Sequence, residues 1–83
     1  MKLTVRYFAS IREALGKSSE LVETDARNVD ALREVLIARG DAYAQSLGHG
    51  KAVRVALDKV MAGGAAALYE GCEVAFFPPV TGG

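Results

Sequence analysis

The chain closes with Glu73-Val74-Ala75-Phe76-Phe77-Pro78-Pro79-Val80-Thr81-Gly82-Gly83, and this stretch decides the fold. Its first part alternates with the period of a strand, so Val74 and Phe76 share one face. If that face points into the core, Ala75 and Phe77 point outward. An exposed phenylalanine beside the end of a strand is a typical partner contact. We therefore assign Phe77 to a partner-binding surface; the alternative is that it only covers part of the sheet.

The second part of this stretch is an arm that leaves the sheet. Proline has a fixed φ and no N–H, so Pro78-Pro79 must continue outward in an extended conformation. The five residues 79–83 can span about 17 Å. Glycines lack a Cβ, so Gly82 and Gly83 can enter a slot too narrow for other residues and deliver the Gly83 carboxylate to its end. The alternative is a frayed chain end.

Size and composition limit the remaining possibilities. The 83 residues form one domain, with a predicted boundary between residues 1–78 and the tail 79–83. Ten basic and ten acidic residues cancel, which argues against nucleic acid or an anionic membrane as the main partner. The apolar runs are too short to cross a bilayer, and no signal peptide precedes the first strand. Because Cys72 is the only cysteine, no internal disulfide forms, and we expect a cytoplasmic protein.

The first half of the chain predicts two strands and two helices. Residues 2–8 alternate as a strand, and residues 9–15 form a short helix closed by Gly16. Residues 20–24 resume the alternation, with Leu21 expected inward. The remaining expectations are a helix capped by Asn28 and ended by Gly40, whose buried stripe is Val29, Leu32, Val35 and Leu36, and a short helix 42–47 capped by Asp41.

The second half predicts three more strands. Residues 53–57 alternate, a brief strand carries Val60 or Met61, and a turn at residues 69–72 leads into the last strand, 73–77. The first and last strands then lie parallel in the middle, and the main helix packs across one face. This is an α+β fold with a mixed sheet, the β-grasp or ubiquitin-like arrangement. Met61 favours the core when taken alone, although it also suits the partner-binding surface of Phe77.

The sequence holds little chemistry of its own. Gly16-Lys17-Ser18 lacks the earlier glycine of a phosphate-binding loop, and Gly63-Gly64 matches no dinucleotide fingerprint. His49 is expected to be solvated, with no carboxylate arranged beside it. Cys72 lies near Glu70 and Glu73, which disfavour a reactive thiolate. We predict no metal site and no bound cofactor, and a stand-alone enzyme is not indicated.

Four stretches carry a resemblance to a known family. They are the ending 73–83, the segments Val5-Arg6-Tyr7-Phe8-Ala9 and Ile11-Arg12-Glu13, and the helix Val29-Asp30-Ala31-Leu32-Arg33. Together they resemble the small subunits of molybdopterin synthase, which are ubiquitin-like sulfur carriers. The chain departs from that family's pattern between residues 57 and 67, where Gly63-Gly64 and three alanines replace bulkier residues.

The resemblance implies a function for the chain end. Gly83 would be adenylated by a ubiquitin-activating-type enzyme that uses ATP, and then thiocarboxylated. The tail would insert into a channel of the large synthase subunit and donate sulfur to cyclic pyranopterin monophosphate. The implied channel residues are Gly82, Thr81, Val80 and Pro79, and the implied docking residues are Phe77, Pro78 and Met61. Catalytic residues would belong to the large subunit, in a heterotetramer of two small and two large subunits.

Two other functions stay open. The same thiocarboxylate can serve tRNA thiolation or thiazole synthesis, or Gly83 can be joined to protein lysines as in a ubiquitin-like modifier. In a different class, the chain is a non-catalytic β-grasp interaction module with an inert tail. Loading of sulfur at Gly83 distinguishes the carriers from the inert module.

Overall fold

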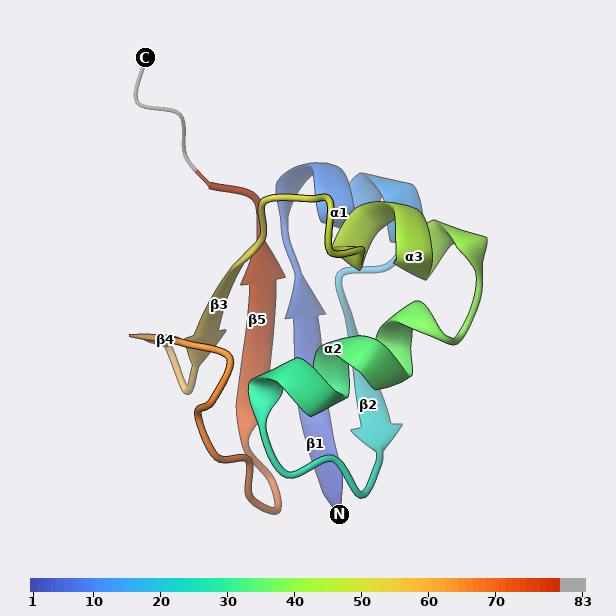
Figure 1. Ribbon diagram of the computed structural model, residues 1–83. Coiled ribbons are helices and arrows are strands. Elements are labelled where there is room, and N and C mark those ends of the chain that lie inside the picture. The colour runs from blue at the N-terminus through green and yellow to red at the C-terminus, as the bar shows by residue number, and fades with distance from the viewer. Residues whose placement is uncertain (80–83) are drawn as a thin grey trace.

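The computed structural model describes residues 1–79 as a mixed sheet with the helices on one face (Figure 1). The elements are β1 (Lys2–Tyr7), α1 (Ala9–Leu15), β2 (Ser19–Glu23), α2 (Val29–Ile37), α3 (Asp41–Leu47), β3 (Arg54–Leu57), β4 (Val60–Ala62) and β5 (Glu73–Phe77). The strand order within these residues is β2-β1-β5-β3-β4. β1 and β5 run parallel at the centre, and the other neighbours are antiparallel. This confirms the predicted α+β, ubiquitin-like β-grasp fold.

The core lies between the central strands and α2. Val74 and Phe76 of β5 are fully buried, and so are Leu32 and Leu36 of α2. The inward residues of β1 are Leu3, Val5 and Tyr7, and each is at most 1% exposed. Each of these side chains contributes about 1.5–3 kcal/mol by leaving water. The alternation of the two central strands therefore predicted the buried face correctly.

The predicted face of β2 is wrong. Leu21 is 75% exposed, whereas Val22 is fully buried. The reason is the register, in which Leu3 of β1 lies opposite Val22. Residues directly opposite each other in neighbouring strands share a face, and Leu3 faces the core. The strand spans Ser19–Glu23, one residue earlier than its predicted start.

The first N–H groups of α2 are paired by Asn28 and by residues 64 and 66, which belong to the segment 57–67 that departs from the pattern of the resembled family. Asn28 caps the helix with its side chain, as predicted. The next two N–H groups, of Val29 and Asp30, donate to the carbonyl oxygens of Ala66 (3.1 Å) and Gly64 (2.9 Å). A Cβ at Gly64 would come within 2.1 Å of the Asp30 carboxylate. A small residue there lets the segment approach the helix and satisfy N–H groups that have no partner within it.

Three expectations for the helices are wrong. Val35 is 38% exposed rather than part of the buried stripe, because Leu32 and Leu36 define the face and Val35 lies about 100° away from Leu36. α2 ends at Ile37, before Gly40. Asp41 does not cap α3; it is the first residue of that helix, and Gly40 occupies the N-cap position without a side-chain bond.

The hairpin of β3 and β4 confirms the short strand at Val60 and Met61. Leu57 lies opposite Val60, so the connection consists of Asp58 and Lys59, and both have positive φ (50° and 70°). Two-residue connections of this type match the twist of the flanking strands. Asp58 also accepts a hydrogen bond from the backbone N–H of Glu73 (2.9 Å), which ties the turn to β5.

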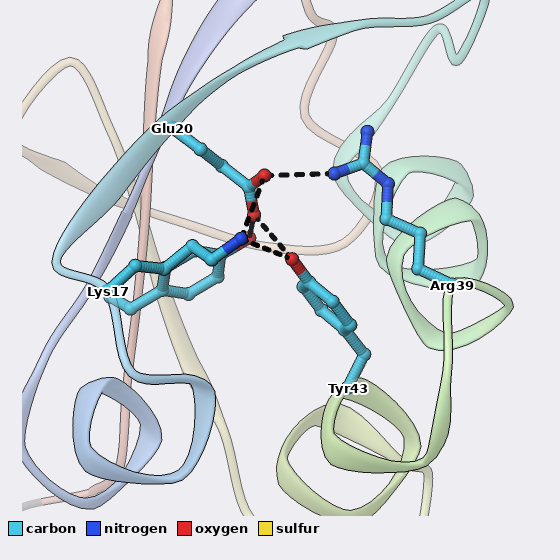
Figure 2. A network of polar contacts seen from close by, with 5 residues as sticks. Lys17, Glu20, Arg39 and Tyr43 are labelled. Carbon is cyan, nitrogen blue, oxygen red and sulfur yellow. Dashed lines mark hydrogen bonds and ion pairs between the residues drawn. The ribbon is translucent and has the colours of Figure 1, made fainter.

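A carboxylate on β2 joins several elements on the helix side of the sheet (Figure 2). Glu20 accepts hydrogen bonds from the hydroxyls of Tyr7 (2.7 Å) and Tyr43 (2.9 Å). Its other oxygen lies 3.0 Å from the Arg39 guanidinium and 3.6 Å from the Lys17 ammonium. Burial by itself raises the pKa of Glu20, but the two tyrosine hydrogen bonds and the two cations outweigh it and lower the pKa below its ordinary value. The ionised carboxylate therefore stabilises the fold.

We expect Glu20→Gln to lower the free energy of unfolding at neutral pH by about 1–2 kcal/mol, because it removes the charge that these groups contact. A carboxyl group whose pKa is lowered by folding contributes stability above its unfolded pKa, near 4.5, and loses it as the pH falls through the folded value. The difference between native protein and variant should therefore shrink below about pH 4.5. Urea titrations between neutral pH and about pH 3 measure it.

Glu23→Gln is the matched control, because Glu23 is an exposed residue of the same strand. Its effect should stay within about 0.5 kcal/mol across this range. A Glu20→Gln penalty that did not change with pH would contradict the role assigned to the charge.

Candidate functional site

The outward face of β5 begins the candidate site. Ala75 and Phe77 lie on the face opposite the buried Val74 and Phe76, as the alternation predicts. Ala75 pairs with Ala56 of β3, and because both side chains are small, the surface of the sheet is recessed at this point. Phe77 and the two prolines that follow it are partly buried at the edge of this surface.

A cavity of about 680 Å³ runs along this face of β5, from Glu73 to the two prolines that follow the strand. We call it the arm groove. Its lining consists of Phe8, Ala9, Ala56, Ala75, Phe77, Pro78 and Pro79, together with the charged Arg6, Lys59 and Glu73. The predicted docking residues Phe77 and Pro78 are thus brought together with Pro79, which was predicted to lie in the channel of a partner. An apolar floor with a few charged residues suits a protein contact.

The sequence reasoning did not assign Phe8 and Arg6 to the site. Phe8 is 38% exposed, and its N–H donates to the carbonyl of Phe76 (3.1 Å), which brings it beside the end of β5. The Arg6 guanidinium lies 5.4 Å from the centre of the Phe8 ring and 3.8 Å from the Glu73 carboxylate. The available signal was the outward phase of Arg6 and Phe8 in the alternation of residues 2–8. Only the parallel pairing with β5 brings them next to Phe77.

Met61 lies on the same face of the sheet as the arm groove, directly opposite the groove residue Ala56. It is 58% exposed, so its preferred assignment to the core is wrong. The register puts it opposite Ala56 on β4, an edge strand with no further neighbour in the described sheet. It lines a smaller cavity of about 240 Å³ with Arg54 and Gly64. Met61 is therefore accessible to a partner and lies beside Ala56 of the arm groove, although it does not itself line the groove.

The predictions for Val80, Thr81, Gly82 and Gly83 concern residues outside the described range, 1–79. The structure describes the two prolines at the root of the arm. Pro78 and Pro79 follow β5 directly and line the arm groove.

His49 and Cys72 do not line the arm groove. His49 is exposed, but its Nε2 contacts the Glu34 carboxylate, so the expectation that no carboxylate lies beside it is wrong. Cys72 is buried, and burial, followed by the charges of Asp58 and Glu70, raises the pKa of its thiol. Asp58 rather than Glu73 is thus the second acidic neighbour. This supports a structural cysteine.

The described residues also show no sign of a phosphate or metal site. Gly16 closes α1 with φ 73°, and the Lys17 ammonium bonds to the Tyr43 hydroxyl (3.1 Å). Residues 1–79 contain no group of three His, Cys, Asp or Glu that could hold a metal ion. None of the helices in this range has the length and hydropathy that crossing a membrane requires. The candidate site within residues 1–79 is therefore the arm groove.

Comparisons with known proteins agree with this geometry. The model of the ThiS family matches residues 5–83. Two curated relatives, the molybdopterin synthase sulfur carrier subunits of Haemophilus influenzae and Escherichia coli, are 41% and 40% identical over 81 residues. Each alignment covers 98% of this chain and 99% of the relative.

Two solved structures share the fold. The solution structure of a Haloferax volcanii protein is 34% identical, has a TM-score of 0.80, and is matched over 100% of this chain and 87% of its own. A chain from the complex of subunits 1 and 2 of the Helicobacter pylori molybdopterin-converting factor is 24% identical, with a TM-score of 0.71 and full coverage of both chains.

The family match spans most of the chain, and the two curated relatives align along nearly their whole length. The chain belongs to the ThiS family.

Proposed function

We propose that this protein is the sulfur carrier subunit of a molybdopterin synthase. The observation that carries the proposal is the apolar arm groove at the root of the Pro78-Pro79 arm. The similarity to two sulfur carrier subunits along nearly their full length supports it. In this proposal residues 1–78 are a handle, and residues 79–83 present the reacting group.

The chemistry of a carboxylate explains why such a handle needs an activating partner. A carboxylate is a poor electrophile until it is converted into a mixed anhydride. An adenylating enzyme would join the Gly83 carboxylate to AMP and release pyrophosphate from ATP. Sulfide from the sulfur donor would then attack the acyl carbon and displace AMP, which leaves a thiocarboxylate on Gly83. Since this step consumes ATP, the proposal includes a cytoplasmic location.

The second partner would be the large subunit of the synthase. The Helicobacter pylori structure of similar fold is a complex of two subunits, which supports a partner of this kind. Phe77 and Pro78 would dock through the arm groove, while Pro79, Val80, Thr81 and Gly82 would lie in the partner's channel. There the sulfur would pass to cyclic pyranopterin monophosphate. We extend the proposal to a heterotetramer of two small and two large subunits, with the catalytic residues on the large one.

Intact-mass analysis tests the proposal. The protein is incubated with ATP, a sulfur donor and an adenylating enzyme that loads a known sulfur carrier. We expect the mass of the carboxyl-terminal peptide to change by the replacement of one oxygen with sulfur. A variant without Gly83 is the control and should stay unmodified. If the native peptide also kept its mass, an inert arm would be the better explanation.

A thiocarboxylate alone does not show where the sulfur goes. The loaded protein is therefore mixed with a large subunit and cyclic pyranopterin monophosphate. Formation of molybdopterin supports the proposal. Sulfur loading without any molybdopterin would favour tRNA thiolation, thiazole synthesis or conjugation to lysines.

A further inference from the structure

The pairing of β5 with its two neighbouring strands ends at Phe76 and Phe77, immediately before the two prolines of the arm. The last paired residue on the β3 side is Phe77, which lies opposite Arg54. On the β1 side the final contact is the hydrogen bond from the N–H of Phe8 to the carbonyl of Phe76. Pro78 and Pro79 have no N–H with which to continue either ladder. The direction of the arm beyond Phe77 therefore depends on what packs against the prolines.

The loop that leads into β3 is in position to provide this packing. Continuing the antiparallel register past Arg54 and Phe77 brings residues 52 and 53 opposite the two prolines. A cavity of about 320 Å³ is bounded by Pro78, by Lys51 and Ala52 of this loop, and by residues of α1 and α3. The loop and Pro78 therefore line the same cavity and lie close to each other.

This loop is held from the opposite side by α2. The Arg33 side chain donates from Nε to the carbonyl of Leu47 (2.5 Å) and from Nη2 to the carbonyls of Gly48 (2.9 Å) and Lys51 (3.3 Å). The planar guanidinium can reach several acceptors at once, which a single ammonium does with poorer geometry. The next residue of α2, Glu34, contacts His49 of the same loop. Two adjacent side chains of one helix thus fasten residues 47–51.

We propose that Arg33 is a positioning residue for the carboxyl-terminal arm. It holds the loop that flanks Pro78, and the loop in turn limits the directions in which the arm leaves the body. The inference rests on the proposed function, because a fixed direction matters when the chain end must enter a partner's active site. Arg33 belongs to α2 and does not line the arm groove, so its variants leave the proposed docking residues Phe77 and Pro78 in place.

The experiment uses Arg33→Gln, which removes the fork of donors, and Arg33→Lys, which keeps the charge. Steady-state adenylation by the activating enzyme is measured as a function of carrier concentration. We expect kcat to fall on the order of tenfold for Arg33→Gln and less for Arg33→Lys, with KM within about twofold of native. The reason is that the variant should still dock normally, which keeps KM, but the chain end would lie at the reaction centre in a smaller fraction of the bound molecules, which lowers kcat. Arg27→Gln, an exposed arginine beside a different cavity with Met1 and Leu68, is the control and should change neither constant.

A second measurement does not depend on the proposed function. Backbone ¹⁵N relaxation of the free, folded protein should show lower order parameters at Ala52 and Phe77 in Arg33→Gln than in native protein and in Arg27→Gln. Unchanged order at both residues would overturn the inference, whatever the enzyme assay shows. A rise in KM with constant kcat would also overturn it, since this would mean a docking or folding defect. If native protein is not adenylated at all, the proposed function fails, and the relaxation data still decide whether Arg33 orders the root of the arm.

Discussion

Addition of one alanine after Gly83 is expected to abolish adenylation of the chain end and to leave the folded domain as stable as before. The extra residue moves the carboxylate about 3.3–3.6 Å along an extended chain. It also brings a Cβ into a slot that Gly82 and Gly83 are suited to enter. Errors in position of this size remove most of the advantage of holding reactants together. ATP–pyrophosphate exchange measures the loss, and thermal unfolding monitors the fold.

The same molecule provides the control for this prediction. A carboxyl-terminal extension that a protease removes exactly after Gly83 should be inactive before cleavage and fully active after it. The body of the protein is identical in the two samples, so a difference can only come from the chain end. Turnover of the uncleaved protein at the native rate would contradict the proposed mechanism.

Replacement of Phe77 by alanine is expected to weaken binding of the large subunit by about 1–3 kcal/mol, or roughly 5- to 150-fold in Kd. Phe77 is partly buried and lines the arm groove beside Phe8 and Pro78. Aromatic side chains that pack into a docking surface commonly contribute much of its binding energy. Its truncation leaves β5 paired through the backbone, so the fold should persist. Isothermal titration calorimetry gives the affinity directly.

Leu21→Ala is the matched control for Phe77→Ala. Leu21 is 75% exposed and lies on β2, an edge strand of the described sheet, away from the arm groove. Its truncation should change the affinity by less than about 0.5 kcal/mol. If both variants bound as tightly as native protein, Phe77 would be a structural cover for the sheet. Equal losses from both would place the interface across the whole outward face.

The two central strands were predictable because each carries its own periodic signal. Alternation in β1 and β5 identified the buried face, and therefore the outward direction of Phe77, without any knowledge of neighbours. Local chemistry likewise predicted Asn28 as a helix cap and Gly16 as a helix end. These features depend on residues close together in the chain. The arm itself is equally local, since Pro78 and Pro79 cannot continue a sheet.

The wrong predictions for Leu21 and Met61 concern residues whose burial depends on the pairing of their strand with a neighbouring strand. Leu21 and Val22 both suit a buried position, and only the pairing of Val22 with Leu3 selects between them. Met61 is exposed because β4 is an edge strand, which its own sequence does not reveal. In such cases the energy comes from contacts between residues far apart in the chain, and a short stretch carries no record of them.

By itself, the sequence determined the fold class, the buried face of the central strands and the chain end proposed to react. Only the tertiary structure decided that Phe8 and Arg6 join Phe77 around the arm groove, and that Arg33 reaches the loop beside Pro78. The physical reason is that alternation and capping act over a few residues. The arm groove and the hydrogen bonds from Arg33 to the loop, in contrast, form only when parallel pairing and helix packing have brought distant segments together.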